Sequence, residues 1–452
     1  MRQAPAATLA GLVEKRVRRL TPPHALILSF LGLALVGMLL LKLPMASHHG
    51  TSWAQAAFTA VSAATVTGLV VVDTGSHFTL FGQSVLLVLM QAGGLGLMTF
   101  GMFVIYLMRD RMSLGHRAQI SEALNQPGQE DMRHLLRMMF GFTAVMELAG
   151  TFLLAIQWVP ELGWRQGLYH SLFHAVSAFN NAGFALRADS LVAYSGHPLV
   201  NIVISSLFIS GGLGFVVIAD VIRKRRFREY ALHTKVMLVG TLVLNLVAML
   251  AVLALEYGNP ATLGQLSSLG DKLWVAWFHG AAPRSAGFNT LDVAGMQPAT
   301  SLLTMVLMFI GGGSGSTAGG IKLGTFIVLV LATRSFLRAD HQPVVFGRSL
   351  DSTVILRALA ISTISVFGVL IGVFLLSITE RGDFLDIAFE GVSAFATSGL
   401  SRGLTPNLSA AGQGLVILMM LIGRVGPLTI AFLLATRRSA AIQYPSGRVN
   451  IG

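Results

Sequence analysis

The hydrophobic pattern of this chain is a series of long apolar runs separated by shorter, more polar segments. Runs of roughly 20 residues, the length that crosses the hydrocarbon core of a bilayer, recur along the whole sequence, for example at 25–41, 236–255 and 354–378. Segments such as 167–179 and 384–396 are also apolar but too short to cross. The pattern therefore predicts an all-α polytopic membrane protein in which short helices enter the membrane without spanning it.

The charges are few and clustered. Of the 452 residues, 54% are hydrophobic and only 12% are charged, and the net charge is +12. The positive-inside rule places clusters of Lys and Arg on the cytoplasmic face, and both termini with them. Basic clusters beside membrane spans favour anionic lipid headgroups, so we expect membrane lipids as partners and no nucleic acid. The five clusters are 15–19, 109–137, 223–235, 334–357 and 437–448.

Several classes of chemistry are excluded by residue type. The chain has no cysteine, which excludes disulfides, thiolate metal sites and cysteine nucleophiles. The first apolar run lacks a small-residue cleavage site and is long enough to span, so it is not read as a signal peptide. No Ser-His-Asp set or pair of carboxylates is visible in the apolar spans, and the histidines show no metal-ligand spacing. We therefore do not expect an enzyme.

One short phrase, a small residue followed by glycine and then Leu or Phe, occurs four times. The central glycines are spaced 115, 104 and 112 residues apart, and each copy follows one of the short apolar segments. A single copy would be a tight turn, whereas four copies in register indicate a repeated structural unit. These four glycine phrases are Thr65-Val66-Thr67-Gly68, Asn180-Asn181-Ala182-Gly183, Arg284-Ser285-Ala286-Gly287 and Thr397-Ser398-Gly399.

The basic clusters and the glycine phrases together predict the domain organisation. Each interval between basic clusters must leave the cytoplasm and return, so it holds a long helix, a re-entrant helix, a glycine phrase and a second long helix. This gives eight spanning and four re-entrant helices in four parallel repeats around a central pore. The repeats are 25–108, 135–221, 236–333 and 354–436, and the cytoplasmic segments are 1–24, 109–134, 222–235, 334–353 and 437–452.

Four glycine phrases that meet at one axis can bind a dehydrated cation. Backbone carbonyls replace the hydration shell of an ion without a full opposing charge, which would trap it. Neighbouring carbonyls point the same way only if some residues adopt a positive φ, and glycine does so at low cost. The sequence therefore predicts that the residues of the four phrases form an ion-binding filter through their backbone.

The second long helix of the third repeat is interrupted at 311–320. Six of these ten residues are glycine, and each costs about 1 kcal/mol in a helix relative to Ala. The segment resembles a phosphate loop, but Ile321 separates its last glycine from Lys322 and the flanks are apolar helices. A close-packing helix interface is the alternative, as we expect at 93–96 and 211–214. The residues are Gly311, Gly312, Gly313, Ser314, Gly315, Ser316, Thr317, Ala318, Gly319 and Gly320.

Two charged residues fall inside predicted spans. Arg424 is placed in the middle of the last one, where a charge costs several kcal/mol unless it meets a polar cavity or a partner, so we expect a functional role. An arginine that snorkels to the interface is the alternative. Glu147 lies mid-span in the second repeat, and its partner cannot be identified from sequence.

Acidic residues gather near the predicted outer mouth of the fourth repeat. They could concentrate cations by electrostatic focusing, or they could belong to an ordinary solvated loop. Asp73 follows the first glycine phrase directly and is the better candidate for the mouth by position. The residues of the fourth repeat are Glu380, Asp383, Asp386 and Glu390.

The order of helix, re-entrant helix, glycine phrase and second helix, four times in one chain, resembles the Trk/Ktr/HKT potassium transporter superfamily. The resemblance covers about 25–436, and the length indicates a KtrB-type ion-conducting subunit. It implies potassium at the filter residues, 311–320 as an intramembrane gate and Arg424 as a positive barrier below the filter. Relatives that prefer sodium carry serine at the position of Gly68, so the glycine here favours potassium.

The resemblance also implies a location and partners. We expect a homodimer in the bacterial inner membrane on a cytoplasmic ring of KtrA-type nucleotide-binding regulatory subunits, with no tightly bound cofactor and with sodium as a candidate activator. The alternative within the fold is a sodium-selective transporter or a sodium-coupled symport. A carrier for organic solutes would show broken helices in two related halves, whereas the sequence indicates four units and one broken helix.

Overall fold

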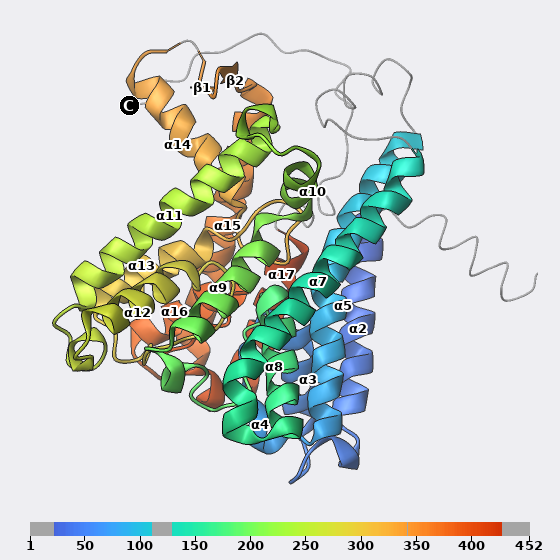
Figure 1. The fold of residues 1–452 in the computed structure, drawn as a ribbon, viewed down its shortest axis with the longest axis vertical. Helices are drawn as coiled ribbons and strands as arrows, with labels where there is room; N and C mark the ends of the chain where they lie inside the picture. The colour runs from blue at the N-terminus through green and yellow to red at the C-terminus, as the bar shows by residue number, and fades with distance from the viewer. Residues whose placement is uncertain (1–21, 111–128, 341, 427–452) are drawn as a thin grey trace, which may run out of the picture.

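The computed structural model describes residues 22–110, 129–340 and 342–426, and these are almost entirely helical (Figure 1). The predicted segments 1–24 and 437–452, and part of 109–134, lie wholly or largely outside the described residues, as does 427–436. Outer helices present apolar side chains to their surroundings: Phe152, Leu250 and Phe367 are 71%, 62% and 61% exposed. A contiguous apolar exterior of this kind fits a lipid environment.

The helices follow one order four times, with a long helix, a short helix and a second long helix in each predicted repeat. The first set is α2 (Pro22–Leu41), α3 (Trp53–Ala64) and α5 (Leu80–Asp110); the second is α7 (Gln129–Leu162), α8 (Trp164–Phe179), α9 (Pro198–Leu213) and α10 (Phe215–Arg223); the third is α11 (Leu232–Glu256), α12 (Leu269–Ala281), α13 (Pro298–Phe309) and α14 (Leu323–Leu337); the fourth is α15 (Ser352–Thr379), α16 (Phe384–Ala396) and α17 (Ala410–Val425). Short connecting helices are α4 (Thr74–His77), η1 (Pro44–Ala46), η2 (Val192–Tyr194), η3 (Phe227–Glu229), η4 (Leu263–Gln265) and η5 (Thr405–Asn407).

Local sequence explains where several helices begin. Ser52 and Gln55 form a capping box at the start of α3, with Gln55 N donating to Ser52 Oγ at 3.2 Å and Ser52 N donating to Gln55 Oε1 at 2.9 Å. Ser409 Oγ accepts from the Gly412 amide at the start of α17. Prolines occupy the first helical position of α9 and α13, where a missing N–H costs nothing.

By length and composition, three helices among the described residues are able to cross a membrane: 136–162, α11 and α15. The pair α9 and α10 makes a fourth if it counts as one span, although it bends by 97°. The sequence predicts a continuous second helix here, and that prediction is wrong. Gly214, with a φ of +94°, separates the two helices, so α13 and α14 are not the only broken pair.

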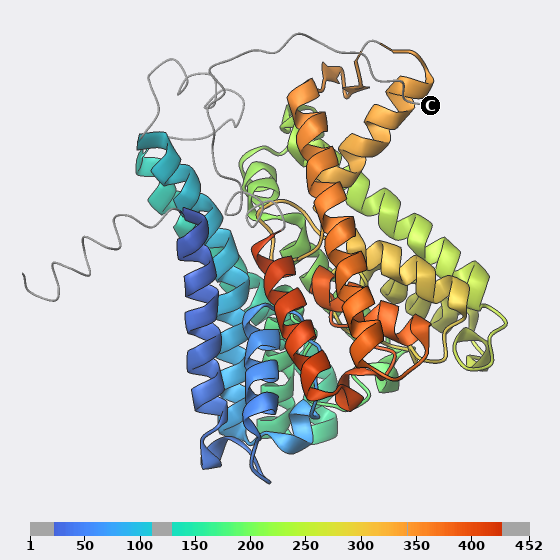
Figure 2. The ribbon, with the colours of Figure 1, turned by 180° about the vertical axis from the view of Figure 1, so that it is seen from behind.

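The contacts between the four sets follow a cyclic order. The second long helix of each set contacts the short helix of the next: α5 contacts α8, α9 contacts α12, and α13 contacts α16. The contact between α17 and α3 closes the ring. Figure 2 shows this closure, with α17 lying between the N-terminal helices and α15. The four glycine phrases are thereby brought to the centre of the molecule.

A two-stranded hairpin is the one departure from the all-α prediction among the described residues. β1 (Val344–Val345) pairs antiparallel with β2 (Arg348–Ser349), with Val344 opposite Ser349 and Val345 opposite Arg348. Phe346 and Gly347 between them both have positive φ, as a type I′ turn requires. The hairpin lies in the link between α14 and α15 (Figure 1).

Candidate functional site

The glycines of the four phrases meet at one point, which we call the glycine junction (Gly68, Gly183, Gly287 and Gly399). All four have φ between +71° and +89°. A Cβ added to Gly183 would lie 2.7 Å from Gly287 Cα, and one added to Gly399 would lie 3.2 Å from Gly68 Cα. Real Cβ atoms do not approach other atoms closer than 3.0 Å, so the second and third phrases can approach this closely only with glycine.

The residue two places before each central glycine is also left-handed. Val66, Asn181, Ser285 and Thr397 have φ of +55°, +57°, +91° and +48°. Positive φ is uncommon outside glycine and is a genuine outlier for a β-branched residue. Two left-handed residues in each phrase, separated by one that is not, give all four phrases the same backbone form. That form allows successive carbonyls to face one side.

Three of the phrases are held by the same hydrogen bonds to the short helix that precedes them. In the first, Val66 N donates to Ala63 O at 3.1 Å and Thr67 N donates to Ser62 O at 2.8 Å. The equivalent amides of the second and fourth phrases donate to equivalent carbonyls: Asn181 N to Ala178 O, Ala182 N to Ser177 O, Thr397 N to Ala394 O and Ser398 N to Ser393 O. The third phrase differs in that Ser285 N donates to Pro283 O.

Polar side chains at the start of the phrases bind the surrounding helices rather than the junction. Thr65 Oγ1 donates to Val61 O at 2.7 Å. Asn180 Nδ2 donates to Gln91 Oε1 at 2.7 Å, and Arg284 Nη1 donates to Asn245 Oδ1 at 2.9 Å. These hydrogen bonds tie the three side chains to the surrounding helices, while Asn180 Oδ1 and Arg284 Nε have no hydrogen-bond partner among the described residues.

Glu147 has amide partners within the described residues. Its carboxylate accepts from Asn180 Nδ2 at 3.1 Å and from Gln91 Nε2 at 3.3 Å. Gln91 comes from α5 and Asn180 is the first residue of the second phrase, so the cluster ties this phrase to α5 and α7. A basic partner is not part of it.

Loop 311–320 forms a closed lobe beside the junction. Its two ends pair: Gly311 N donates to Ile321 O and Leu323 N donates to Gly312 O, both at 2.9 Å. Ser316, Thr317 and Ala318 are fully buried. The alternative of a helix interface is therefore wrong, since the segment is not helical; Ser314 and Gly315 at its tip are exposed.

The lobe is seated against three of the phrases. Thr317 Oγ1 accepts from Asn181 Nδ2 at 2.6 Å in the second phrase. Gly319 N donates to Ser285 Oγ at 2.9 Å in the third. At the fourth, a Cβ on Gly319 would lie 2.6 Å from Ala396 O, directly before Thr397. A lobe so placed fills the space on one side of the phrases.

Insertion of the lobe also explains the break between α9 and α10. Gly313 N donates to Gly212 O at 2.7 Å, and Phe215 N donates to Gly315 O at 3.1 Å. The backbone groups at the end of α9 thus bind the lobe instead of continuing the helix. Gly211 does pack closely against Phe179 O at the end of α8, as its sequence predicts, whereas Gly214 lies at the break and packs against Ser314 O of the loop.

Arg424 is deeply buried, with 2% of its side chain exposed, but it is not in the middle of a helix. It lies in the last turn of α17, which ends at Val425 before Gly426 with a φ of +92°. Its Nη1 donates to Thr317 O, and its Nη2 donates to Gly93 O at 2.8 Å. The guanidinium thereby joins loop 311–320 to α5, which argues against snorkelling.

A cavity of about 300 Å³ lies where the chain leaves the four central glycines. Asp73 and Asp292 line it together with Arg187 and Arg402. Asp73 is therefore at the mouth, as its position indicates, although its Oδ2 also accepts from Ser76 N at 2.7 Å to begin α4. The mouth carries both signs of charge.

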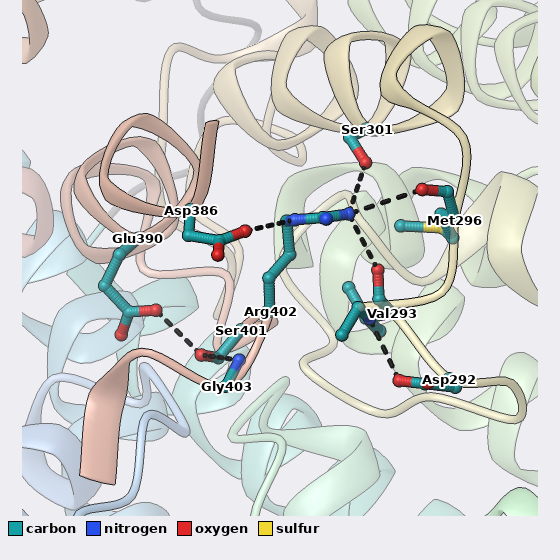
Figure 3. A network of polar contacts seen from close by, with 10 residues as sticks. Asp292, Val293, Met296, Ser301, Asp386, Glu390, Ser401, Arg402 and Gly403 are labelled. Carbon is teal, nitrogen blue, oxygen red and sulfur yellow. Dashed lines mark hydrogen bonds and ion pairs between the residues drawn. The ribbon is translucent and has the colours of Figure 1, made fainter. Parts of the chain in front are cut away.

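Carboxylates of the fourth repeat are bound within a polar network (Figure 3). Asp386 Oδ1 pairs with Arg402 Nε at 2.6 Å, and Arg402 Nη1 donates to Val293 O and Ser301 Oγ. Glu390 is fully buried and accepts from Ser401 Oγ at 2.7 Å. Glu380 likewise accepts from Ser409 N. Arg402 was not predicted, because its partners lie up to 109 residues away.

The chain is similar in sequence to known cation transport proteins. The family model "TrkH: Cation transport protein" matches residues 26–444. "Ktr system potassium uptake protein B" of Bacillus subtilis (strain 168) is 49% identical over 434 residues, covering 96% of this chain and 97% of that one. "Potassium/sodium uptake protein NtpJ" of Enterococcus hirae is 36% identical, covering 98% of this chain and 100% of that one.

The fold also matches a solved structure, that of the potassium transporter TrkH from Vibrio parahaemolyticus. The TM-score is 0.71 at 18% sequence identity, with 92% of this chain and 86% of that chain covered, which supports the fold alone. The relatives are ion transporters and not enzymes, so the prediction that the chain is not an enzyme is confirmed. The predicted resemblance is confirmed as well: the chain belongs to the TrkH family of cation transport proteins.

Proposed function

We propose that this protein takes up potassium through a channel-like path whose selectivity filter is made of the four glycine phrases. The observation that carries the proposal is the glycine junction, where four phrases of one backbone form meet with their glycines in van der Waals contact. Carbonyls presented from four sides at such a point suit a dehydrated monovalent cation. Potassium is the ion named for the relative at 49% identity.

The proposed filter comprises residues 65–68, 180–183, 284–287 and 397–399, and it lies on the axis of four parallel repeats. The cyclic contacts between second long helices and short helices support this arrangement, because each repeat then meets its neighbours in the same way. The short helices α3, α8, α12 and α16 act as re-entrant pore helices. The repeat boundaries proposed from the sequence, 25–108, 135–221, 236–333 and 354–436, fit this order of helices.

Loop 311–320 acts as the gate in this proposal. Its burial and its hydrogen bonds to the second and third phrases support a role as a plug on the cytoplasmic side of the filter. Arg424 adds a positive charge, and its hydrogen bonds connect loop 311–320 to α5. Cations would then pass only when the loop withdraws from the phrases.

The proposal includes a setting and partners. The distribution of Lys and Arg supports the bacterial inner membrane with both termini in the cytoplasm, where anionic lipids meet the basic segments. The name "Ktr system" of two relatives supports a multi-component assembly, and we assign to it a homodimer on a KtrA-type nucleotide-binding ring. Potassium is cargo, and sodium is an activator.

Sodium selectivity or sodium coupling is the second candidate. The relative from Enterococcus hirae is named for both potassium and sodium, and it matches this chain over almost its full length. Glycine at position 68 favours potassium, because the family resemblance associates serine at this position with a preference for sodium.

Ion uptake into a host that lacks its own potassium transport tests the proposal. The chain should restore growth at low potassium and should take up rubidium in preference to sodium. Gly68→Ser should reduce that preference, because a side chain at φ +89° beside Gly183 Cα distorts the filter. Sodium uptake that exceeds rubidium uptake would favour the second candidate, and an unchanged preference in Gly68→Ser would contradict the filter assignment.

A further inference from the structure

The glycine phrases are not braced alike. In the first, Ser62 Oγ donates to Leu69 O at 2.7 Å, and in the second Ser177 Oγ donates to Phe184 O at 2.8 Å. Each hydroxyl thus holds the carbonyl that follows the central glycine from inside the preceding short helix. The spacing is seven residues in both. The equivalent position before Phe288 in the third phrase is Ala281, which has no hydroxyl. The equivalent Ser393 of the fourth phrase has a buried hydroxyl without a hydrogen-bond partner among the described residues, so the third phrase differs from it in lacking the hydroxyl itself.

The backbone of the third phrase is also anchored in a different pattern. Its short helix is followed by Pro283, which has no N–H to donate. Ser285 N bonds to Pro283 O only two residues back and Ala286 N bonds to Ala282 O at 2.9 Å, unlike the pattern shared by the first, second and fourth phrases. Ser285 itself has a φ of +91°, a conformation that a residue with a Cβ rarely adopts and that costs of order one to a few kcal/mol elsewhere in proteins.

Ser285 is held instead from outside its own repeat. Its buried hydroxyl donates to Thr397 O at 3.0 Å in the fourth phrase and accepts from Gly319 N at 2.9 Å in loop 311–320. The adjacent Arg284 donates from Nη2 to Gly311 O at 3.4 Å at the neck of the same loop. The contacts that replace the missing brace therefore come from loop 311–320 and from the fourth phrase.

We propose that Ser285 is the positioning residue of the third phrase and that its hydroxyl makes the ion selectivity of the filter depend on loop 311–320. Resting on the proposed function, this assigns to Ser285 a hydroxyl brace like those of Ser62 and Ser177, except that it holds a carbonyl of the neighbouring phrase, Thr397 O. The difference is that its hydrogen-bond donor, Gly319 N, belongs to the loop. Withdrawal of the loop removes that donor and leaves the strained third phrase with one contact fewer.

The reverse dependence follows from thermodynamic linkage. A loop that stabilises the filter form of the third phrase is itself stabilised when that form is populated. An ion that fits the four phrases favours the form and therefore favours the seated loop, whereas an ion that fits poorly does not. Ser285 can carry this coupling directly, because its single hydroxyl oxygen donates to Thr397 O and accepts from Gly319 N.

The test is the ratio of rubidium to sodium uptake in proteoliposomes that contain the full chain. Ser285→Ala should lower the ratio about tenfold, the effect of losing two neutral hydrogen bonds, whereas Ser285→Thr keeps the hydroxyl and should keep the ratio. Ser285→Gly relieves the positive φ without restoring the hydroxyl, so it should resemble Ser285→Ala. Ser365→Ala, which removes another fully buried serine hydroxyl in α15, is the matched control and should not change the ratio.

A second variant makes the test independent of folding defects. Ala281→Ser places a hydroxyl seven residues before Phe288, as in the first two phrases, and should restore part of the lost ratio in the Ser285→Ala background. A ratio in Ser285→Ala equal to that of Ser365→Ala overturns the proposal, and so does equal loss in Ser285→Thr and Ser285→Ala. Gly68→Ser, measured in parallel, distinguishes failure of the filter assignment from failure of the Ser285 proposal. If Gly68→Ser changes the uptake ratio and Ser285→Ala does not, the filter assignment stands and only the role of Ser285 fails.

Discussion

Thr317→Val is the most direct probe of how tightly loop 311–320 is held. The substitution keeps the shape of the side chain and removes only its hydroxyl, which accepts from Asn181 Nδ2 at 2.6 Å. The amide of Asn181 is itself buried and would lose this acceptor. A lost hydrogen bond with a buried donor left unpaired costs about 2 kcal/mol, which shifts the balance toward the unseated loop by about 30-fold.

The measurement is basal rubidium uptake in proteoliposomes without any cytoplasmic partner. Thr304→Val is the matched control, because Thr304 is equally buried and its hydroxyl bonds only within α13, to Thr300 O at 2.8 Å. In an Asn181→Gly background, which tolerates the positive φ, Thr317→Val should add less than it does alone, since only the longer hydrogen bond from Thr317 Oγ1 to Phe179 O at 3.4 Å is left to lose. If basal uptake in Thr317→Val is no higher than in Thr304→Val, the loop is not held by this contact and the reasoning fails.

Three further outcomes are expected. Gly93→Ala should lower the unfolding temperature in detergent, because its Cβ would overlap the last carbonyl of α3, whereas Gly32→Ala has open space around it and should be neutral or stabilising by about 0.5–1 kcal/mol; equal shifts would contradict the packing argument. Arg402→Gln should raise the rubidium concentration for half-maximal uptake by loosening the mouth, and an unchanged value would leave the Asp386 pair without a role in transport. Deletion of 312–319 should raise basal uptake and weaken dependence on the cytoplasmic partner, and unchanged uptake would refute gating by this loop.

The helices were predictable from sequence because their signals are local. Apolar runs, serine caps and prolines at first helical positions fix them, so the short helix before the fourth phrase is predicted at 384–396 and observed as α16 over the same residues. The break at Gly214 was not predictable from its own helix. A lone Gly-Gly-Leu-Gly in an apolar run is compatible with a continuous helix, and this one breaks because a segment about 100 residues later supplies its hydrogen bonds.

The site was predictable in its backbone and not in its side chains. Repetition of the glycine phrase indicates that four segments share one conformation, and positive φ at Gly68, Gly183, Gly287 and Gly399 agrees with that. Arg284 and Arg424 bind backbone carbonyls and the side-chain amide of Asn245, and none of these partners forms a recognisable sequence pattern. These arginines have no carboxylate partner among the described residues, so charge pairing in the sequence does not indicate them.

One glycine position shows how a common unit has diverged. Gly93, Gly211 and Gly423 each pack against the carbonyl four residues before the central glycine of their own phrase, and a Cβ at any of them would overlap it. The next residue is Gly94, Gly212 and Arg424 in the same three sets. In the first set, the side chain of Asn180 packs against Gly94. In the second set, Gly212 O accepts a hydrogen bond from Gly313 N of loop 311–320.

Arginine is accommodated in the fourth set because α17 ends at the next residue, Val425, and because two carbonyls from other sets, Thr317 O and Gly93 O, face its guanidinium. Gly93 O belongs to the equivalent glycine of the neighbouring set, so the arginine uses the packing site of the first set as its anchor. The close-packing glycines thus leave backbone carbonyls accessible. Arg424 binds one of these, Gly93 O, together with Thr317 O of loop 311–320, and so connects the loop to α5. In the proposed function, control of the path therefore depends on where the four sets differ, at Ala281, Gly214, loop 311–320 and Arg424, and not on the unit that they share.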